Sequence, residues 1–66
     1  MPYSKLRGRI KEYFGTETNF AKAINLSRTS ISLRLNKKID WKQTEIKKAC
    51  SLLHIESVNI NAFFFE

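Results

Sequence analysis

The chain has 66 residues, 42% of them hydrophobic and 27% charged, which predicts a single small domain over residues 1–66 with one core and no deep catalytic pocket. Twelve basic and six acidic side chains give a net charge of +6, and the excess of positive charge lies in residues 1–40. Such an excess suits binding to nucleic acid or to an anionic membrane, although it can also serve solubility alone. The single cysteine, Cys50, excludes an internal disulfide and a thiolate zinc site, so we expect no enzyme activity, cofactor, metal or small-molecule substrate.

The hydrophobic pattern predicts short helices and no sheet. Leu6, Ile10 and Phe14 recur at helical spacing and indicate a first helix over about residues 4–14, which Gly15 ends because glycine readily adopts the left-handed conformation. No signal peptide is recognisable, and no apolar run approaches the ~18 residues of a membrane span. We therefore expect a cytoplasmic protein that does not bind membranes.

A second and a third helix are expected on either side of a tight turn. Thr16 is a suitable N-cap for a helix over about residues 17–24, and Asn25 tolerates the left-handed conformation that would end this helix. Ser27 is the next N-cap and opens a helix over about residues 28–35.

A fourth helix is predicted after a basic loop. Asp40, with Gln43 three residues later, forms a capping-box variant that would start this helix near Trp41 or Lys42. Its apolar side chains recur at the spacing of a core-facing stripe: Ile46, Ala49, Cys50 and Leu53.

A short fifth helix would begin at Glu56 or Ser57, which makes the expected fold an all-α, compact bundle of four to five short helices. The last four residues are Phe63, Phe64, Phe65 and Glu66, an unusually apolar segment that needs a partner surface. We expect at least one ring to close the core. Phe64 and Phe65 are the predicted contacts of a two-fold homodimer, weak in solution and strengthened when both protomers bind adjacent half-sites.

Residues 16–38 have the spacing of a helix-turn-helix. Ala21 is small where the following helix would cross, and Asn25 allows a sharp turn between the two helices. Leu26 and Ile31 would fix the angle between them from the inside. This pattern is the central feature of the predicted bundle.

The stretch FAKAINLSRTSISLRLN resembles the helix-turn-helix of phage Cro and CI-type repressors, within the broad Xre-like group. The longer run YSKLRGRI…FAKAI…LSRTSISLRLNKK…W…EIKKAC is similar to short Cro-like regulators of Gram-positive prophages, over nearly the whole chain. The resemblance implies a five-helix, lambda repressor-like domain that binds an operator, usually as a dimer, and represses transcription at the nucleoid of the bacterial host.

The sequence departs from the family pattern at four positions. Asn25 and Lys37 stand where the family often has glycine, and Arg34 stands where an apolar residue is common, so that Leu35 takes the inward role. Glu17 opens the second helix near the expected DNA backbone, where a carboxylate repels phosphate.

A helical wheel with Ile31 and Leu35 inward turns the opposite side of the third helix outward, and burial of Thr29 and Leu33 would overturn this geometry. Arginine can donate two hydrogen bonds to guanine, and Leu33 would pack on a thymine methyl group. The alternatives are that Arg28 contacts only phosphate and that Leu33 packs against the fourth helix or the tail. The predicted base contacts are Arg28, Thr29, Ser30, Ser32 and Leu33.

Contacts with the DNA backbone are expected on either side of this face, and no acidic residue interrupts residues 18–39. Lys37 and Lys38 directly follow the predicted recognition helix, although a solvated loop is the alternative. The predicted phosphate contacts are Thr18, Asn19, Ser27, Asn36, Lys37 and Lys38.

The sequence therefore predicts a transcriptional regulator that binds double-stranded DNA, with residues 28–35 in the major groove of an operator half-site. The alternative is a helical protein-interaction module, such as an antitoxin-like or adaptor domain. A basic helix at a membrane surface is disfavoured because core-forming side chains recur along the whole chain.

Overall fold

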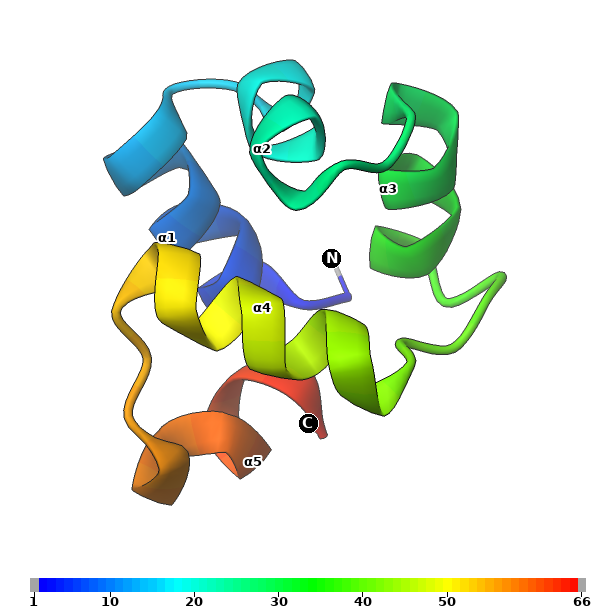
Figure 1. Cartoon of the computed structure of the whole chain (residues 1–66). Helices are drawn as coiled ribbons and strands as arrows, with labels where there is room; N and C mark the ends of the chain where they lie inside the picture. Colours follow the sequence, from blue (N-terminus) through cyan, green and yellow to red (C-terminus); the bar gives the residue numbers. More distant parts are fainter. Residues whose placement is uncertain (1, 66) are drawn as a thin grey trace.

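The structure is a computed structural model that describes residues 2–65, and within this range the chain forms helices and no strand (Figure 1). The elements in chain order are α1 (Ser4–Phe14), α2 (Glu17–Ile24), α3 (Arg28–Leu35), α4 (Gln43–Leu53), the short 3-10 helix η1 (Ser57–Asn59) and α5 (Ile60–Phe64). The predicted all-α fold is confirmed, as are the helices expected over residues 4–14, 17–24 and 28–35. None of the described helices is long and apolar enough to cross a membrane.

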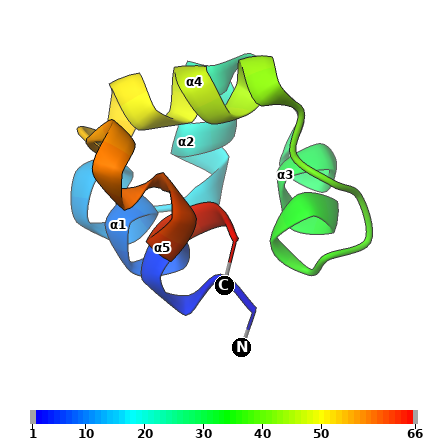
Figure 2. The same ribbon diagram turned by 90° about the horizontal axis from the view of Figure 1, so that it is seen from below.

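Helix α2 lies at the centre of the arrangement and packs against α1, α3 and α4. Helix α5 packs against α1, on the side of the molecule away from α3 (Figure 2). The recognition helix of the sequence analysis, α3, therefore stands at one edge of a bundle whose principal extents are 28 × 23 × 22 Å.

The ends of α2 and the start of α3 are formed by the capping residues that the sequence predicted. The Thr16 hydroxyl accepts a hydrogen bond from the Asn19 N–H at 3.1 Å, and the Ser27 hydroxyl accepts one from the Ser30 N–H at 3.0 Å. Both side chains satisfy amides that a helix start leaves without a carbonyl partner. Asn25 ends α2 in the left-handed conformation, with φ at 64°. These caps set the bounds of both helices.

The start of α4 differs from the prediction. The helix begins at Gln43, after an extended Lys42, and the side chain that reaches back is Glu45, whose carboxylate accepts a hydrogen bond from the Lys42 N–H at 2.8 Å. Trp41 is buried against the Phe64 ring, which holds the chain extended at this point. The capping box assigned to Asp40 and Gln43 is therefore wrong, and the helix starts later.

The core is formed by apolar side chains from all the α-helices and from the segments around Trp41 and Ile55. Ile31 and Leu35 of α3 are fully buried, as the helical wheel required. In the predicted α4 stripe, Ala49 is buried and Cys50 packs against the core, where burial raises the pKa of its thiol. The buried apolar residues are Tyr3, Leu6, Ile10, Phe20, Ala21, Ile24, Ile31, Leu35, Trp41, Ala49, Leu53, Ile55, Phe63 and Phe64.

A buried ion pair joins α3 to α4. The Arg34 guanidinium donates to both carboxylate oxygens of Glu45, at 3.0 and 2.9 Å, and also to the Ser30 carbonyl at 3.0 Å. The two side chains are only 8% and 12% exposed, respectively. Arg34, which stands where the family often has an apolar residue, is thus paired inside the protein. The pair joins α3 to the first turn of α4.

This pair makes the stability of the fold depend on acid. The hydrogen bonds from Arg34, reinforced by the one from the Lys42 N–H, lower the pKa of Glu45 below its ordinary value. A carboxyl group with a lowered folded-state pKa stabilises the fold fully above its unfolded pKa, near 4.5, and that stabilisation is lost as pH falls through the folded value.

We therefore expect urea denaturation at about pH 6 and about pH 3 to show a smaller loss of stability on acidification for Glu45→Gln than for the wild type. Glu12→Gln, which removes an exposed carboxylate paired with Arg9 at 3.8 Å, is the matched control and should retain the wild-type loss. Equal acid dependence in the wild type and Glu45→Gln would contradict this account of the pair.

Candidate nucleic-acid interface

Helix α3 divides into a buried side and an exposed side. Opposite Ile31 and Leu35, Thr29 is exposed and the Leu33 residue is 36% exposed. Arg28 flanks this side at the start of the helix, where its side chain is 60% exposed and faces Glu17. Thr29 and Leu33 therefore face outward in the structure, as predicted. Leu33 is not buried under α4 or the C-terminal residues. Thr29 and Leu33 form an exposed strip, with Arg28 at its end. Their hydrogen-bond donors and apolar surface can match the acceptors and methyl groups on the edges of base pairs.

The two serines predicted to contact bases are less available. Ser30 and Ser32 are half-buried at the sides of this strip. The Ser30 hydroxyl lies 3.0 Å from the Ser27 hydroxyl, and the Asn36 amide donates to the Ser32 backbone carbonyl at 2.9 Å and to the Ser32 hydroxyl at 3.4 Å. Both serines thus help to shape the ends of α3.

Three of the predicted phosphate contacts use their side chains in hydrogen bonds within the protein: Ser27, which caps the start of α3, Asn19 and Asn36. The Asn19 side-chain amide donates to the Phe14 carbonyl at 2.9 Å and so caps the end of α1. Asn36 ends α3 and binds Ser32 with its amide nitrogen. Their side chains hold the helix ends in place, and the donors that remain for a backbone phosphate are fewer than the sequence indicated.

The basic loop after α3 is exposed at both lysines. Lys37 has a left-handed backbone, with φ at 60°, and its ammonium group lies 5.3 Å from the centroid of the Tyr3 ring. The Lys38 N–H donates to the Leu33 carbonyl at 2.8 Å, which ties the loop back onto α3. Lys38 therefore projects from a defined backbone position next to the exposed strip of α3.

Arg7 is a positioning residue that the sequence analysis did not identify. From α1 its guanidinium donates to the Leu35 carbonyl at 2.9 Å and to the Asn36 side-chain oxygen at 3.0 Å. It also donates to the Glu17 carboxylate at 3.2 Å. Arg7 thus binds the carbonyl end of α3 and the first residue of α2 at once, and links α3 to α1.

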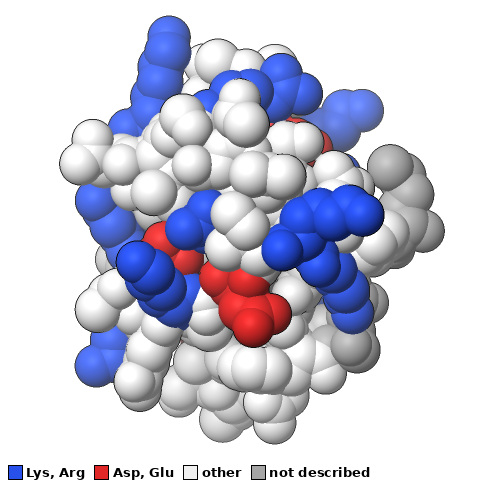
Figure 3. Space-filling model, turned by 90° about the vertical axis from the view of Figure 1, so that its right-hand side faces the viewer, with Lys and Arg blue, Asp and Glu red and all other residues white. Residues whose placement is uncertain are grey.

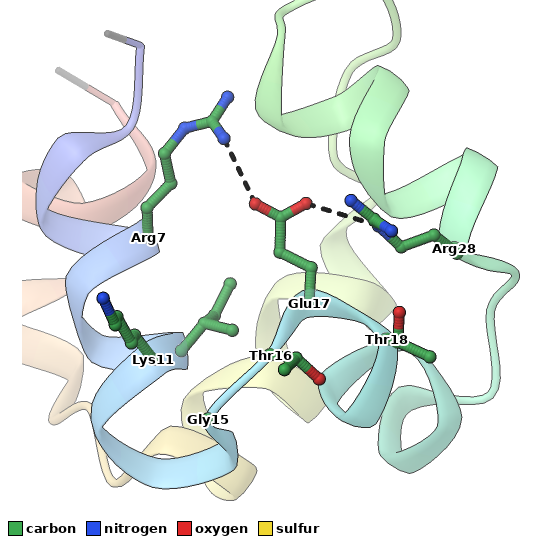
Figure 4. A pocket seen from close by; sticks show the side chains of 8 residues that line it. Arg7, Lys11, Gly15, Thr16, Glu17, Thr18 and Arg28 are labelled. Atoms are coloured by element: carbon green, nitrogen blue, oxygen red, sulfur yellow. Dashed lines mark hydrogen bonds and ion pairs between the residues drawn. The ribbon is translucent and has the colours of Figure 1, made fainter.

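A cavity of about 520 Å³ opens between α1, the start of α2 and the start of α3 (Figure 4). Glu17 points into it between two arginines, and its second oxygen lies 3.6 Å from the Arg28 guanidinium. Thr18 lies at its rim. The residues that line the cavity are Arg7, Ile10, Lys11, Gly15, Thr16, Glu17, Thr18 and Arg28.

The face on the α3 side carries mixed charge. Figure 3 shows lysine and arginine side chains spread around this face, with a smaller acidic area between them. Because residues 18–39 contain no acid, the acidic surface comes from other parts of the chain. Within residues 2–65 no group of three or more His, Cys, Asp or Glu side chains could hold a metal ion.

The chain is similar to known proteins over nearly its whole length. A family model described as a protein of unknown function, DUF739, matches residues 1–66. The chain belongs to the DUF739 family. It is similar to the solution structure of the modulator of repression (MOR) of the temperate bacteriophage TP901-1 from Lactococcus lactis, with a TM-score of 0.87 and 45% sequence identity over 97% of this chain and 86% of that chain. No curated protein matches it. The resemblance of the sequence to phage regulatory proteins is supported to this extent.

The aromatic end of this DUF739 protein is only partly available for a dimer. Phe64 is 4% exposed, and its ring meets the Trp41 ring edge-on at 5.4 Å between centroids. Phe63 is buried too, beneath the Arg9 guanidinium. The assignment of Phe64 to a dimer contact is corrected for this reason, because its ring is used within the core. Phe65 is 63% exposed and is the remaining candidate.

Proposed function

We propose that this protein is a Cro-like regulator of phage repression that binds double-stranded DNA, with α3 in the major groove of an operator half-site. The observation that carries the proposal is the division of α3: Ile31 and Leu35 are buried, whereas Arg28, Thr29 and Leu33 are exposed. A short helix fixed from behind, with polar and apolar side chains turned outward, fits the geometry of a recognition helix. The similarity to a phage modulator of repression supports the regulatory role.

Each exposed group has a distinct part in this proposal. Arg28 would donate two hydrogen bonds to a guanine, and Leu33 would cover a thymine methyl group. Lys37 and Lys38 would bind backbone phosphates beside the groove and set the position of α3 without reading sequence. Binding of this kind occupies a promoter and requires no cofactor and no catalytic step.

A homodimer is part of the proposal. An exposed Phe65 at the end of the chain offers a small apolar contact that two copies could share around a two-fold axis. Such a contact is weak alone and gains from simultaneous binding to two half-sites, about 34–36 Å apart for adjacent turns of the duplex. The selected operator should then be a near-palindrome.

Selection from random duplexes tests the function directly. The wild type should select one motif, and Arg28→Ala should lose preference at one base pair of it, while Lys38→Ala should weaken binding to every sequence alike. If about five phosphates are neutralised per protomer, the logarithm of affinity should fall with the logarithm of salt concentration with a slope near −4 to −5. Lys47→Ala, which removes an exposed lysine of α4, is the control for net charge.

The proposal is wrong if no motif is enriched and the wild type does not retain a duplex at low salt. Unchanged binding by both Arg28→Ala and Lys38→Ala would leave DNA binding intact but remove α3 and its loop as the interface.

Binding to a partner protein is the second candidate function. The observation that favours it is the mixed charge of the face on the α3 side, where an acidic area lies between the basic side chains and suits a protein partner better than a phosphate backbone. The name of the similar phage protein, a modulator of repression, is compatible with an action on a repressor or on DNA. The absence of duplex binding in the selection would favour this helical interaction module.

A further inference from the structure

The Glu17 carboxylate lies among basic side chains that could otherwise bind an anion from outside the protein. The cavity at the start of α2 is lined by three basic side chains and by one acidic side chain, that of Glu17. The two oxygens of this carboxylate lie 3.2 Å from the Arg7 guanidinium and 3.6 Å from the Arg28 guanidinium. Figure 4 shows the carboxylate between them, with both ion pairs drawn.

The same arrangement of donors suits a phosphate. Carboxylate and phosphate oxygens both accept the paired hydrogen bonds of arginine, and the amides at a helix start favour negative charge. Thr18 adds a hydroxyl group at the rim of the cavity, whereas the Thr16 hydroxyl caps α2 through the Asn19 N–H. Lys11 adds a third positive charge there. With Glu17 in place, these groups already hold one negative charge.

We propose that Glu17 limits the affinity of this protein for DNA by occupying, between Arg7 and Arg28, the place that a backbone phosphate would take. The inference rests on the proposed DNA-binding function for its biological role, but the anion site itself can be tested without DNA. Arg28 meets Glu17 through its Nε, so a phosphate in that place leaves its two terminal nitrogens for the guanine of the proposed complex. The effect does not depend on base sequence, because a phosphate carries no sequence information. Glu17 therefore weakens operator and non-operator binding together and makes the complex easier to dissociate.

The test replaces the carboxylate by its neutral isostere. Glu17→Gln keeps the shape of the side chain and frees the cavity to take one phosphate. Affinity for a duplex of scrambled sequence should rise about three- to tenfold at ~0.1 M salt, and the salt slope should steepen by about 0.9 per protomer. The affinity for the selected operator should rise by the same factor. Glu12→Gln, which removes the same charge from an exposed position on α1, should change affinity less than about twofold.

Two further measurements separate this role from a general change in charge. In an Arg28→Ala background, Glu17→Gln should lose most of its effect, because the proposed phosphate site needs both arginines. Titration of Glu17→Gln with inorganic phosphate should shift the amide resonances of Thr16 and Thr18 to saturation, whereas the wild type and Glu12→Gln should show no saturable shift.

The outcomes separate this inference from the proposed function. A Glu17→Gln protein that behaves like Glu12→Gln, both on scrambled duplex and with inorganic phosphate, overturns the role of Glu17 even if the wild type recognises an operator. Saturable phosphate binding by Glu17→Gln, with no operator found for the wild type, supports the role of Glu17 and rejects the proposed function.

Discussion

Arg34→Ala is expected to lower the free energy of unfolding by about 3–5 kcal/mol, because it leaves the buried Glu45 carboxylate without its partner. The protein has 66 residues, so its total stability is expected to be about 3–10 kcal/mol at ~0.05–0.15 kcal/mol per residue. The substitution therefore removes a large share of it. Urea denaturation followed by far-UV circular dichroism at neutral pH measures the loss.

The double variant Arg34→Met with Glu45→Met is the control for this result. It removes both charges and keeps apolar volume between α3 and α4, so it should regain most of the stability that Arg34→Ala loses. A loss below about 1 kcal/mol for Arg34→Ala would show that water solvates the pair and that the pair does not fix α3.

Leu33→Glu is expected to weaken operator binding by about 30- to 100-fold, while leaving the fold intact. The Leu33 residue is 36% exposed on α3, so far-UV circular dichroism should show wild-type helix content for the variant. In the proposed complex the new carboxylate would face the groove and the phosphates beside it. Like charges at an interface cost several kcal/mol, and the expected loss of affinity corresponds to about 2–3 kcal/mol. Fluorescence anisotropy with the selected duplex measures the effect.

Val58→Glu is the matched control for Leu33→Glu. Val58 is 82% exposed in η1, on the α5 side of the molecule, and its replacement makes the same change in net charge. We expect it to reduce affinity only a few-fold, through the long-range field. Equal effects of the two substitutions would place the interface somewhere other than on α3.

The bounds of α2 and the start of α3 were predictable because local residues decide them, whereas the start of α4 was not. Thr16, Asn25 and Ser27 act on amides within three residues or through their own backbone angle, and a single sequence displays such signals. The inward direction of Ile31 and Leu35 followed from their spacing in the same way.

The features that escaped prediction depend on contacts between distant segments. Arg7 binds the Leu35 carbonyl across 28 positions of sequence, and Arg34 finds Glu45 eleven positions away on another helix. Nothing in the local pattern distinguishes these arginines from solvated ones. The hydrogen bonds of Asn19 likewise depend on where α1 ends, and they reduced the set of side chains available to a phosphate.

The division of α3 has a consequence for how such proteins diversify. The side chains that hold the helix in place and those that face outward are different residues, since Ile31, Arg34 and Leu35 are buried while Thr29 and Leu33 are not. Substitutions at the outward positions cost little stability. If α3 reads DNA as proposed, changes at two or three codons would alter the target preference and leave the scaffold unaltered.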